Sequence, residues 1–177
     1  MQEWHTLGAP WRAAFELAWE AFGAGTIPVG AVVTDADGTV LARGRNRITE
    51  SSAPEGQIFG SRVAHAEINA LVQLGMGRRY FDCTLWTTLE PCAQCIAAAW
   101  ISTIGRVEFA APDIRRRIEA DRAPDRPVAQ TFRERLPEWS GSPNRSVLAT
   151  MAAAELDDVL PRIWDELAAA APPPLQP

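Results

Sequence analysis

Lysine is absent from this chain of 177 residues, so all 17 of its basic side chains are arginine. Histidine and cysteine are also scarce, with two and three residues respectively. The formal net charge of −5 argues against a broad surface for binding phosphates. No apolar stretch approaches the roughly 20 residues that span a bilayer, and the N-terminus shows no basic leader followed by an apolar run. We therefore expect a cytoplasmic protein that does not enter a membrane.

The three cysteines do not suit a disulfide framework, because their number is odd and Cys92 and Cys95 form a C-x-x-C motif. A metal site in a reducing compartment fits this pattern better. His65, Cys92 and Cys95 supply three ligands for a zinc ion, which leaves a fourth position open for water. A purely structural zinc site is the alternative, but such sites usually have four protein ligands. The spare cysteine, Cys83, alternates with apolar strand residues, so we expect it in the core.

Glu67 lies beside this predicted metal site and is not needed to hold the ion, so its carboxylate is free to move protons. Residues two apart diverge in the middle of a helix, so His65 and Glu67 converge only if a helix begins close to residue 64. Cys92 and Cys95 are three apart and share one face of a helix that Pro91 opens. The spacing therefore predicts a zinc site at two helix N-termini.

The hydrophobic pattern predicts one α/β domain over residues 1–171, with its core motifs at 26–110. Asp35 to Gly38 is typical of a hairpin turn. After residue 113 we expect a helical extension to about 171, and a disordered tail at 172–177. Helices are expected over 10–21, from 65 to about 75 and from 91 onward, and strands over 28–34, 39–43, 83–87 and 106–110.

From about residue 26 to 109 the chain resembles the cytidine-deaminase-like superfamily, in particular the branch of tRNA-specific adenosine deaminases and bacterial guanine deaminases. The pattern H-x-E followed by P-C-x-x-C is typical of zinc-dependent nucleobase deaminases. The resemblance implies a three-layer α/β/α fold with a mixed five-stranded sheet, and commonly a homodimer. The matching segments are Pro28-Val29-Gly30-Ala31-Val32-Val33, Asn46, Ala64-His65-Ala66-Glu67, Thr88-Leu89-Glu90-Pro91-Cys92, Cys95 and Ile104-Gly105-Arg106-Val107.

The resemblance also implies which residues meet the substrate. Asn46 is expected to hydrogen-bond the base, and the segment from Val29 to Ala31 to line the pocket. For Glu90 a second interpretation stays open, in which it interacts only with the dipole of the helix that follows. The full set of expected substrate-binding residues is Asn46, Val29, Ala31, Ala66, Glu90 and Pro91.

The positions at which this sequence differs from the family pattern predict the substrate. In the tRNA enzymes that the chain resembles, an Asp-Pro-Thr-Ala-His-Ala-Glu stretch follows the asparagine closely, whereas 18 residues separate Asn46 from His65 here. We expect the loop over residues 47–61 to cover the pocket mouth and restrict entry to small molecules. The leading hypothesis is a zinc-dependent hydrolytic deaminase of a free nucleobase or nucleoside. The alternatives are a tRNA-specific adenosine deaminase, and an inactive zinc-stabilised module that binds nucleotides.

Overall fold

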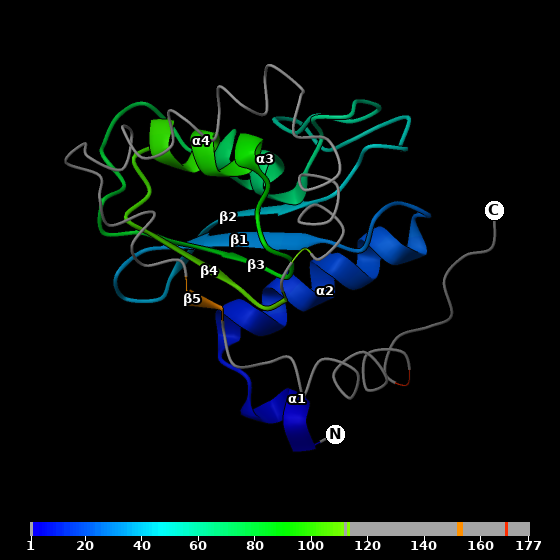
Figure 1. The fold of residues 1–177 in the computed structure, drawn as a ribbon, viewed down its shortest axis with the longest axis horizontal. Coiled ribbons are helices and arrows are strands. Elements are labelled where there is room, and N and C mark those ends of the chain that lie inside the picture. The colour runs from blue at the N-terminus through cyan, green and yellow to red at the C-terminus, as the bar shows by residue number, and fades with distance from the viewer. Residues whose placement is uncertain (1, 112, 114–151, 154–168, 170–177) are drawn as a thin grey trace, which may run out of the picture.

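The chain folds into three layers, with a sheet between helices. The computed structural model describes residues 2–111, 113, 152–153 and 169. Figure 1 shows α3 and α4 over one face of the sheet and α2 over the other, which confirms the α/β/α architecture. The elements are α1 (Gln2–Thr6), α2 (Ala9–Gly23), β1 (Gly30–Thr34), β2 (Val40–Arg45), α3 (Ala66–Leu71), β3 (Thr84–Thr87), α4 (Ala93–Ile101), β4 (Arg106–Phe109) and β5 (Ala152–Ala153).

The sheet is mixed and has five strands in the order β2-β1-β3-β4-β5. Strand β1 pairs antiparallel with both β2 and β3, whereas β3 and β4 are parallel, as are β4 and β5. A parallel pair needs a crossover connection, and α4 supplies the one between β3 and β4. All five residues of β1 are buried, because this strand is paired on both edges and covered on both faces.

The hairpin between β1 and β2 forms where the sequence predicts it. The Asp35 carboxylate accepts hydrogen bonds from the backbone N–H groups of Asp37 and Thr39 at 3.0 and 2.8 Å. Gly38 closes the turn with a φ of +81°, a conformation that side chains with a Cβ disfavour. The turn thereby fixes the register of β2 against β1.

Three local predictions need correction. Helix α3 ends at Leu71 and not near Gly75, because the chain leaves it through tighter turns in which Gln73 and Leu74 donate to carbonyls three residues back. Pro91 does not open α4, since Cys92 has an extended backbone and the helix begins at Ala93. Residues 152–153, expected as helix within the 113–171 extension, form β5 and pair with the edge of β4.

Two further points concern the ends of the chain. The sequence pattern did not predict α1, which precedes a small cluster in which Leu7, Phe15 and Ala110 are buried and Trp4 packs against them. Residues 114–151, 154–168 and 170–171 of the expected helical extension, and the tail at 172–177, lie outside the described residues. None of the helices in the described part of the chain is long and apolar enough to cross a bilayer.

The larger core lies between the sheet and the two helices α3 and α4. Its members come from alternate positions of the central strands, from the buried sides of both helices and from the segment before β3. Cys83 lies in that segment and is 1% exposed, which confirms that it belongs to the core. This packing fixes the N-terminal ends of α3 and α4 above one end of the sheet. The buried residues are Val29, Ala31, Val33, Ala42, Ala66, Ala70, Leu71, Tyr80, Cys83, Leu85, Ala99, Ile104 and Val107.

Two glycines set how closely the helices approach the sheet. A Cβ on Gly30 would lie 2.0 Å from the backbone oxygen of Ala14 in α2. A Cβ on Gly44 would lie 2.3 Å from both the Ala66 oxygen and the Ala70 nitrogen in α3. The sheet therefore touches helical backbone directly at these positions, and α3 rests on β2 through its first turn.

We expect Gly44→Ala to displace α3 and to lower the free energy of unfolding by about 1–3 kcal/mol, as overpacking of a close contact does. Chemical denaturation measures this loss. Gly75→Ala is the matched control, because a Cβ there has no atom within 4 Å, and we expect its effect to stay within about 0.5 kcal/mol. Equal stability of the two variants would contradict the direct contact between α3 and β2.

Candidate active site

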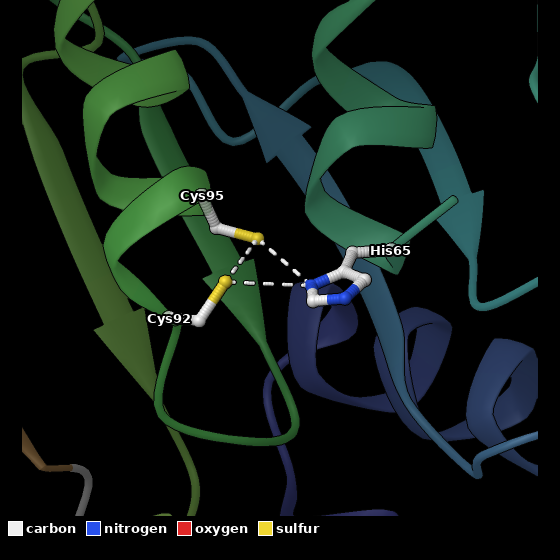
Figure 2. Close-up of side chains that lie close together, drawn as sticks. All are labelled: His65, Cys92 and Cys95. Carbon is white, nitrogen blue, oxygen red and sulfur yellow. Dashed lines mark hydrogen bonds between the residues drawn. The ribbon is translucent and has the colours of Figure 1, made fainter. Parts of the chain in front are cut away.

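His65, Cys92 and Cys95 lie together although 26 residues of chain separate His65 from Cys92. The His65 Nδ1 atom is 3.4 Å from each sulfur, and the two sulfurs are 3.5 Å apart. Figure 2 shows the imidazole approaching from α3 and both thiols from the start of α4, with all three donor atoms facing one point. The structure thus brings together the three residues that the sequence predicts as ligands.

Both helices present their first ligand in the same way. His65 is the N-cap residue of α3 and Cys92 that of α4, and each has an extended backbone with ψ of 157° and 170°. N-cap positions usually hold side chains that bond the helix backbone, but neither His65 nor Cys92 makes such a bond. The side chains of His65 and Cys92 are therefore directed to the shared cluster. The N-cap position of His65 also agrees with the predicted start of a helix close to residue 64.

The spacing of these donor atoms fits a zinc ion. Tetrahedral zinc with bonds of about 2.3 Å to sulfur and 2.0–2.1 Å to nitrogen places two sulfurs about 3.8 Å apart, and sulfur and nitrogen about 3.6 Å apart. The observed distances of 3.4–3.5 Å are close to these values. Among the described residues the cluster that could hold a metal contains three donors, so it matches a site with one open position.

The two thiols differ in their protonation. A hydrogen bond from Cys95 lowers the pKa of Cys92 to about 3. The same hydrogen bond, together with burial, raises the pKa of Cys95 well above the usual range of a thiol. Zinc is bound by thiolates, so metal binding displaces the protons that these thiols carry.

Glu67 lies in the first turn of α3, next to the cluster, and is only 4% exposed. The Thr87 hydroxyl, at the end of β3, donates to its Oε1 atom at 3.3 Å. Burial raises the pKa of Glu67, and the charge of Cys92 adds to this, while nearby His65 opposes it. Strand register explains the contact, because Thr87, Ala31 and Gly44 are aligned across the sheet and so share the face beneath α3.

Asn46 lies just after β2 and is 3% exposed. Its backbone N–H donates to the Val29 carbonyl at 2.9 Å, and the next residue, Arg47, donates to the Ala64 carbonyl at 2.9 Å. The structure therefore connects Asn46 to the predicted pocket segment on one side and to the residue before His65 on the other.

The other predicted substrate residues surround this region. Val29 lines an apolar cavity of about 270 Å³ with Phe15, Ile27, Pro28, Thr88 and Leu89. This cavity borders the site through Val29 and through the segment that leads to Cys92, but the metal ligands do not line it. Ala31 and Ala66 are fully buried beneath and within α3, and Pro91 is buried directly before Cys92.

Glu90 makes a structural contact that differs from both interpretations. Its Oε2 atom accepts a hydrogen bond from the backbone N–H of Asp113 at 3.0 Å, and its own N–H donates to the Ala111 carbonyl at 2.7 Å. These bonds connect the segment before α4 to the chain after β4. A role for Glu90 in binding substrate stays a prediction.

Sequence reasoning missed Asn69, which is fully buried on α3. Its Nδ2 group donates to the carbonyls of Arg45 and Ile58 at 3.0 and 3.1 Å, and its Oδ1 accepts from the Ile58 N–H at 2.7 Å. Asn69 thereby joins α3 to β2 and to the long loop. An amide among the alanines and leucine of a short buried helix was the signal in the sequence, because such a group needs partners.

Arg47 fastens the base of the long loop and was also missed. Its carbonyl accepts from the N–H groups of Glu50 and Gly60 at 3.2 and 3.0 Å. Its side chain binds the carboxylate of Glu50 and, at 2.8 Å, the Gln57 oxygen. The two ends of the loop are thus held together beside Asn46, whereas the expectation that residues 47–61 cover the pocket mouth stays a prediction.

Comparisons with known proteins agree with this geometry. Residues 8–111 match the family model described as the cytidine and deoxycytidylate deaminase zinc-binding region. The chain is 41% identical over 108 residues to tRNA(Ile)-lysidine synthase of Deinococcus radiodurans, covering 59% of this chain and 17% of that protein. It is 39% identical over 105 residues to the tRNA-specific adenosine deaminase of Haemophilus influenzae, covering 58% and 56%.

Comparison with solved structures points to the same family. The solved structure of guanine deaminase from Bacillus subtilis superposes with a TM-score of 0.50 at 32% identity, covering 60% of this chain and 66% of that one. The chain spans less than two thirds of the length of the curated relatives named above. The matched family region holds the whole cluster of His65, Glu67, Cys92 and Cys95, and the chain belongs to the cytidine and deoxycytidylate deaminase family through this zinc-binding region.

Proposed function

We propose that this protein is a zinc-dependent hydrolytic deaminase of a free nucleobase or nucleoside, with His65, Cys92 and Cys95 as the metal ligands. The observation that carries the proposal is the position of Glu67. A buried carboxylate is costly unless a cation or several hydrogen bonds compensate it, and the described residues place no arginine in an ion pair with Glu67. A costly group beside a three-donor cluster is typical of a catalytic acid or base.

The residues of the chain divide the chemistry among them. Zinc held by the three donors would supply an activated water molecule at neutral pH. Glu67 would take one proton from water to the ring nitrogen beside the amino-bearing carbon, and would then take the remaining hydroxyl proton to the departing amine. Water is consumed, ammonia is released and a carbonyl group replaces the amino group. Thr87 holds the carboxylate in place through its hydrogen bond to Oε1.

The observations support two alternative functions less well than the proposed one. An inactive zinc-stabilised module has no need for a buried carboxylate beside the cluster. A tRNA-specific adenosine deaminase is favoured by the 39% identity to the Haemophilus influenzae enzyme. Against it stands the net charge of −5, because phosphate contacts dominate binding to nucleic acids. The homodimer and the cytoplasmic location expected from the sequence stay predictions.

Metal content tests the ligand set. We expect about one zinc per chain in the purified protein and much less in Cys92→Ala, because two donors hold zinc far more weakly than three. Elemental analysis measures both. Cys83→Ala is the matched control, since Cys83 is a buried free cysteine outside the cluster, and it should keep its zinc. Full occupancy in Cys92→Ala would remove the site as described.

Turnover tests the proton carrier. Glu67→Gln should keep the zinc and the fold but lose deamination by at least about 10²–10⁴-fold, the usual contribution of general acid–base transfer. The rate of ammonia release on the best substrate measures the effect, with zinc content and thermal unfolding as controls for the site and the fold. Turnover near that of the wild type would contradict the assigned role.

A substrate panel tests the proposed function as a whole. We expect ammonia release from at least one member of a set containing cytosine, guanine, adenine and their nucleosides, and no inosine formation in an anticodon stem–loop that carries adenosine at the wobble position. The physical reason is the net charge of −5, which disfavours a broad phosphate-binding surface. Inosine in the RNA without turnover of any small substrate would show that the tRNA alternative is right.

A further inference from the structure

The carboxamide of Asn46 has one orientation. Its Oδ1 atom is 2.8 Å from the Thr26 hydroxyl and 3.2 Å from the backbone nitrogen of Ile48. A backbone N–H can only donate, so the atom that faces Ile48 must be the amide oxygen. The second donor to that oxygen is therefore the Thr26 hydroxyl.

Thr26 is itself held in place. It is 8% exposed and lies between α2 and β1, where its backbone N–H donates to the Ala21 carbonyl at 3.1 Å. The two donors occupy both lone pairs of the Asn46 oxygen. What remains of the carboxamide is the Nδ2 group, which carries two hydrogen-bond donors and no acceptor.

No acceptor among the described residues binds this Nδ2 group. Asn46 is nevertheless 97% buried, with only 3% of its surface exposed. The Nδ2 atom is not among the fully buried atoms that lack a partner, so it reaches an open surface. A ligand that covers this group has to bring its own acceptor, because leaving a buried donor unpaired costs about 1–3 kcal/mol.

The chemistry of deamination limits which acceptor that is. The ring nitrogen beside the amino-bearing carbon gains a proton and changes from an acceptor to a donor. An acceptor elsewhere on the ring, such as a carbonyl oxygen or a second ring nitrogen, keeps its lone pair from substrate to product. A bond to that second acceptor stabilises substrate and transition state equally, so it acts on KM and not on kcat.

We propose that Thr26 is a positioning residue whose hydroxyl fixes the Asn46 carboxamide with its oxygen inward, so that the site selects aminated heterocycles carrying a second acceptor outside the reacting amidine. This inference rests on the proposed function for its substrate class. It assigns Thr26 and Asn46 to substrate selection and leaves the proton transfers to Glu67.

The test compares each base with analogues in which one acceptor is replaced by C–H. The pairs are cytosine with 4-aminopyrimidine, guanine with 7-deazaguanine, and adenine with its 3-deaza and 7-deaza forms. For the base that is turned over, we expect the wild type to prefer the parent over one analogue by about 5- to 150-fold in kcat/KM, the equivalent of one unpaired buried donor.

Substitutions at Thr26 then distinguish a role in positioning Asn46 from a role in stability alone. Thr26→Val removes the hydroxyl but keeps the shape of the side chain, so we expect a KM about 3- to 10-fold higher, an unchanged kcat and a smaller preference for the parent base. Thr26→Ser keeps the hydroxyl and should restore both. A Thr26→Val variant with wild-type KM and wild-type preference would overturn the inference.

Asn46→Asp provides a second variant should Thr26→Val fail to fold. It keeps the shape of Asn46 and replaces the outward donors by an acceptor, so the parent base should bind about 10-fold or more weakly. Unchanged binding overturns the inference. If the wild type releases ammonia from no base, the proposed function fails, and calorimetric binding of the same pairs to the zinc-loaded protein still decides the role of Thr26.

Discussion

The contact between the backbone of α3 and the surface of β2 is the constraint on which the site depends. Gly44 lets the first turn of α3 rest directly on the strand, with the Ala66 oxygen and the Ala70 nitrogen where a Cβ would lie. His65 and Glu67 flank Ala66, so the position of this turn decides where the imidazole and the carboxylate point. This packing contact thereby sets the positions of His65 and Glu67, the residues proposed as a metal ligand and as the proton carrier.

Buried polar groups then fix the rest of the site. Asn69 connects α3 to β2 and the long loop, Arg47 closes the base of that loop, and Thr87 holds Glu67. These groups all have partners, as buried polar groups require. The Glu67 carboxylate is buried without an ion pair to a described arginine, and the outward amino group of Asn46 has no partner among the described residues. Functional sites are where groups of this kind are expected.

Much of this could be predicted from the sequence because the chemistry imposes strict spacing. The three ligands, the start of α3, the hairpin at Asp35 and the alternation of helices and strands follow from local patterns, and the structure agrees with them. Residue roles that depend on contacts distant in the chain were out of reach. Thr26 contacts Asn46 across 20 residues and Asn69 contacts Arg45 across 24, and no periodicity in the sequence reveals such pairs. The two-residue strand β5 was missed because its alanines favour helix by propensity, and pairing with β4 overrides that preference.

X-ray absorption at the zinc edge tests the central claim most directly, because it counts the ligands of the metal in the intact protein. An open, catalytic site predicts two sulfur ligands at about 2.3 Å, one imidazole nitrogen at about 2.0 Å and a fourth light ligand that does not come from the protein. The signal of that fourth ligand should change when a substrate-like base is added. Three or four sulfur ligands, or a fully protein-ligated ion that a base leaves unaltered, would contradict the account.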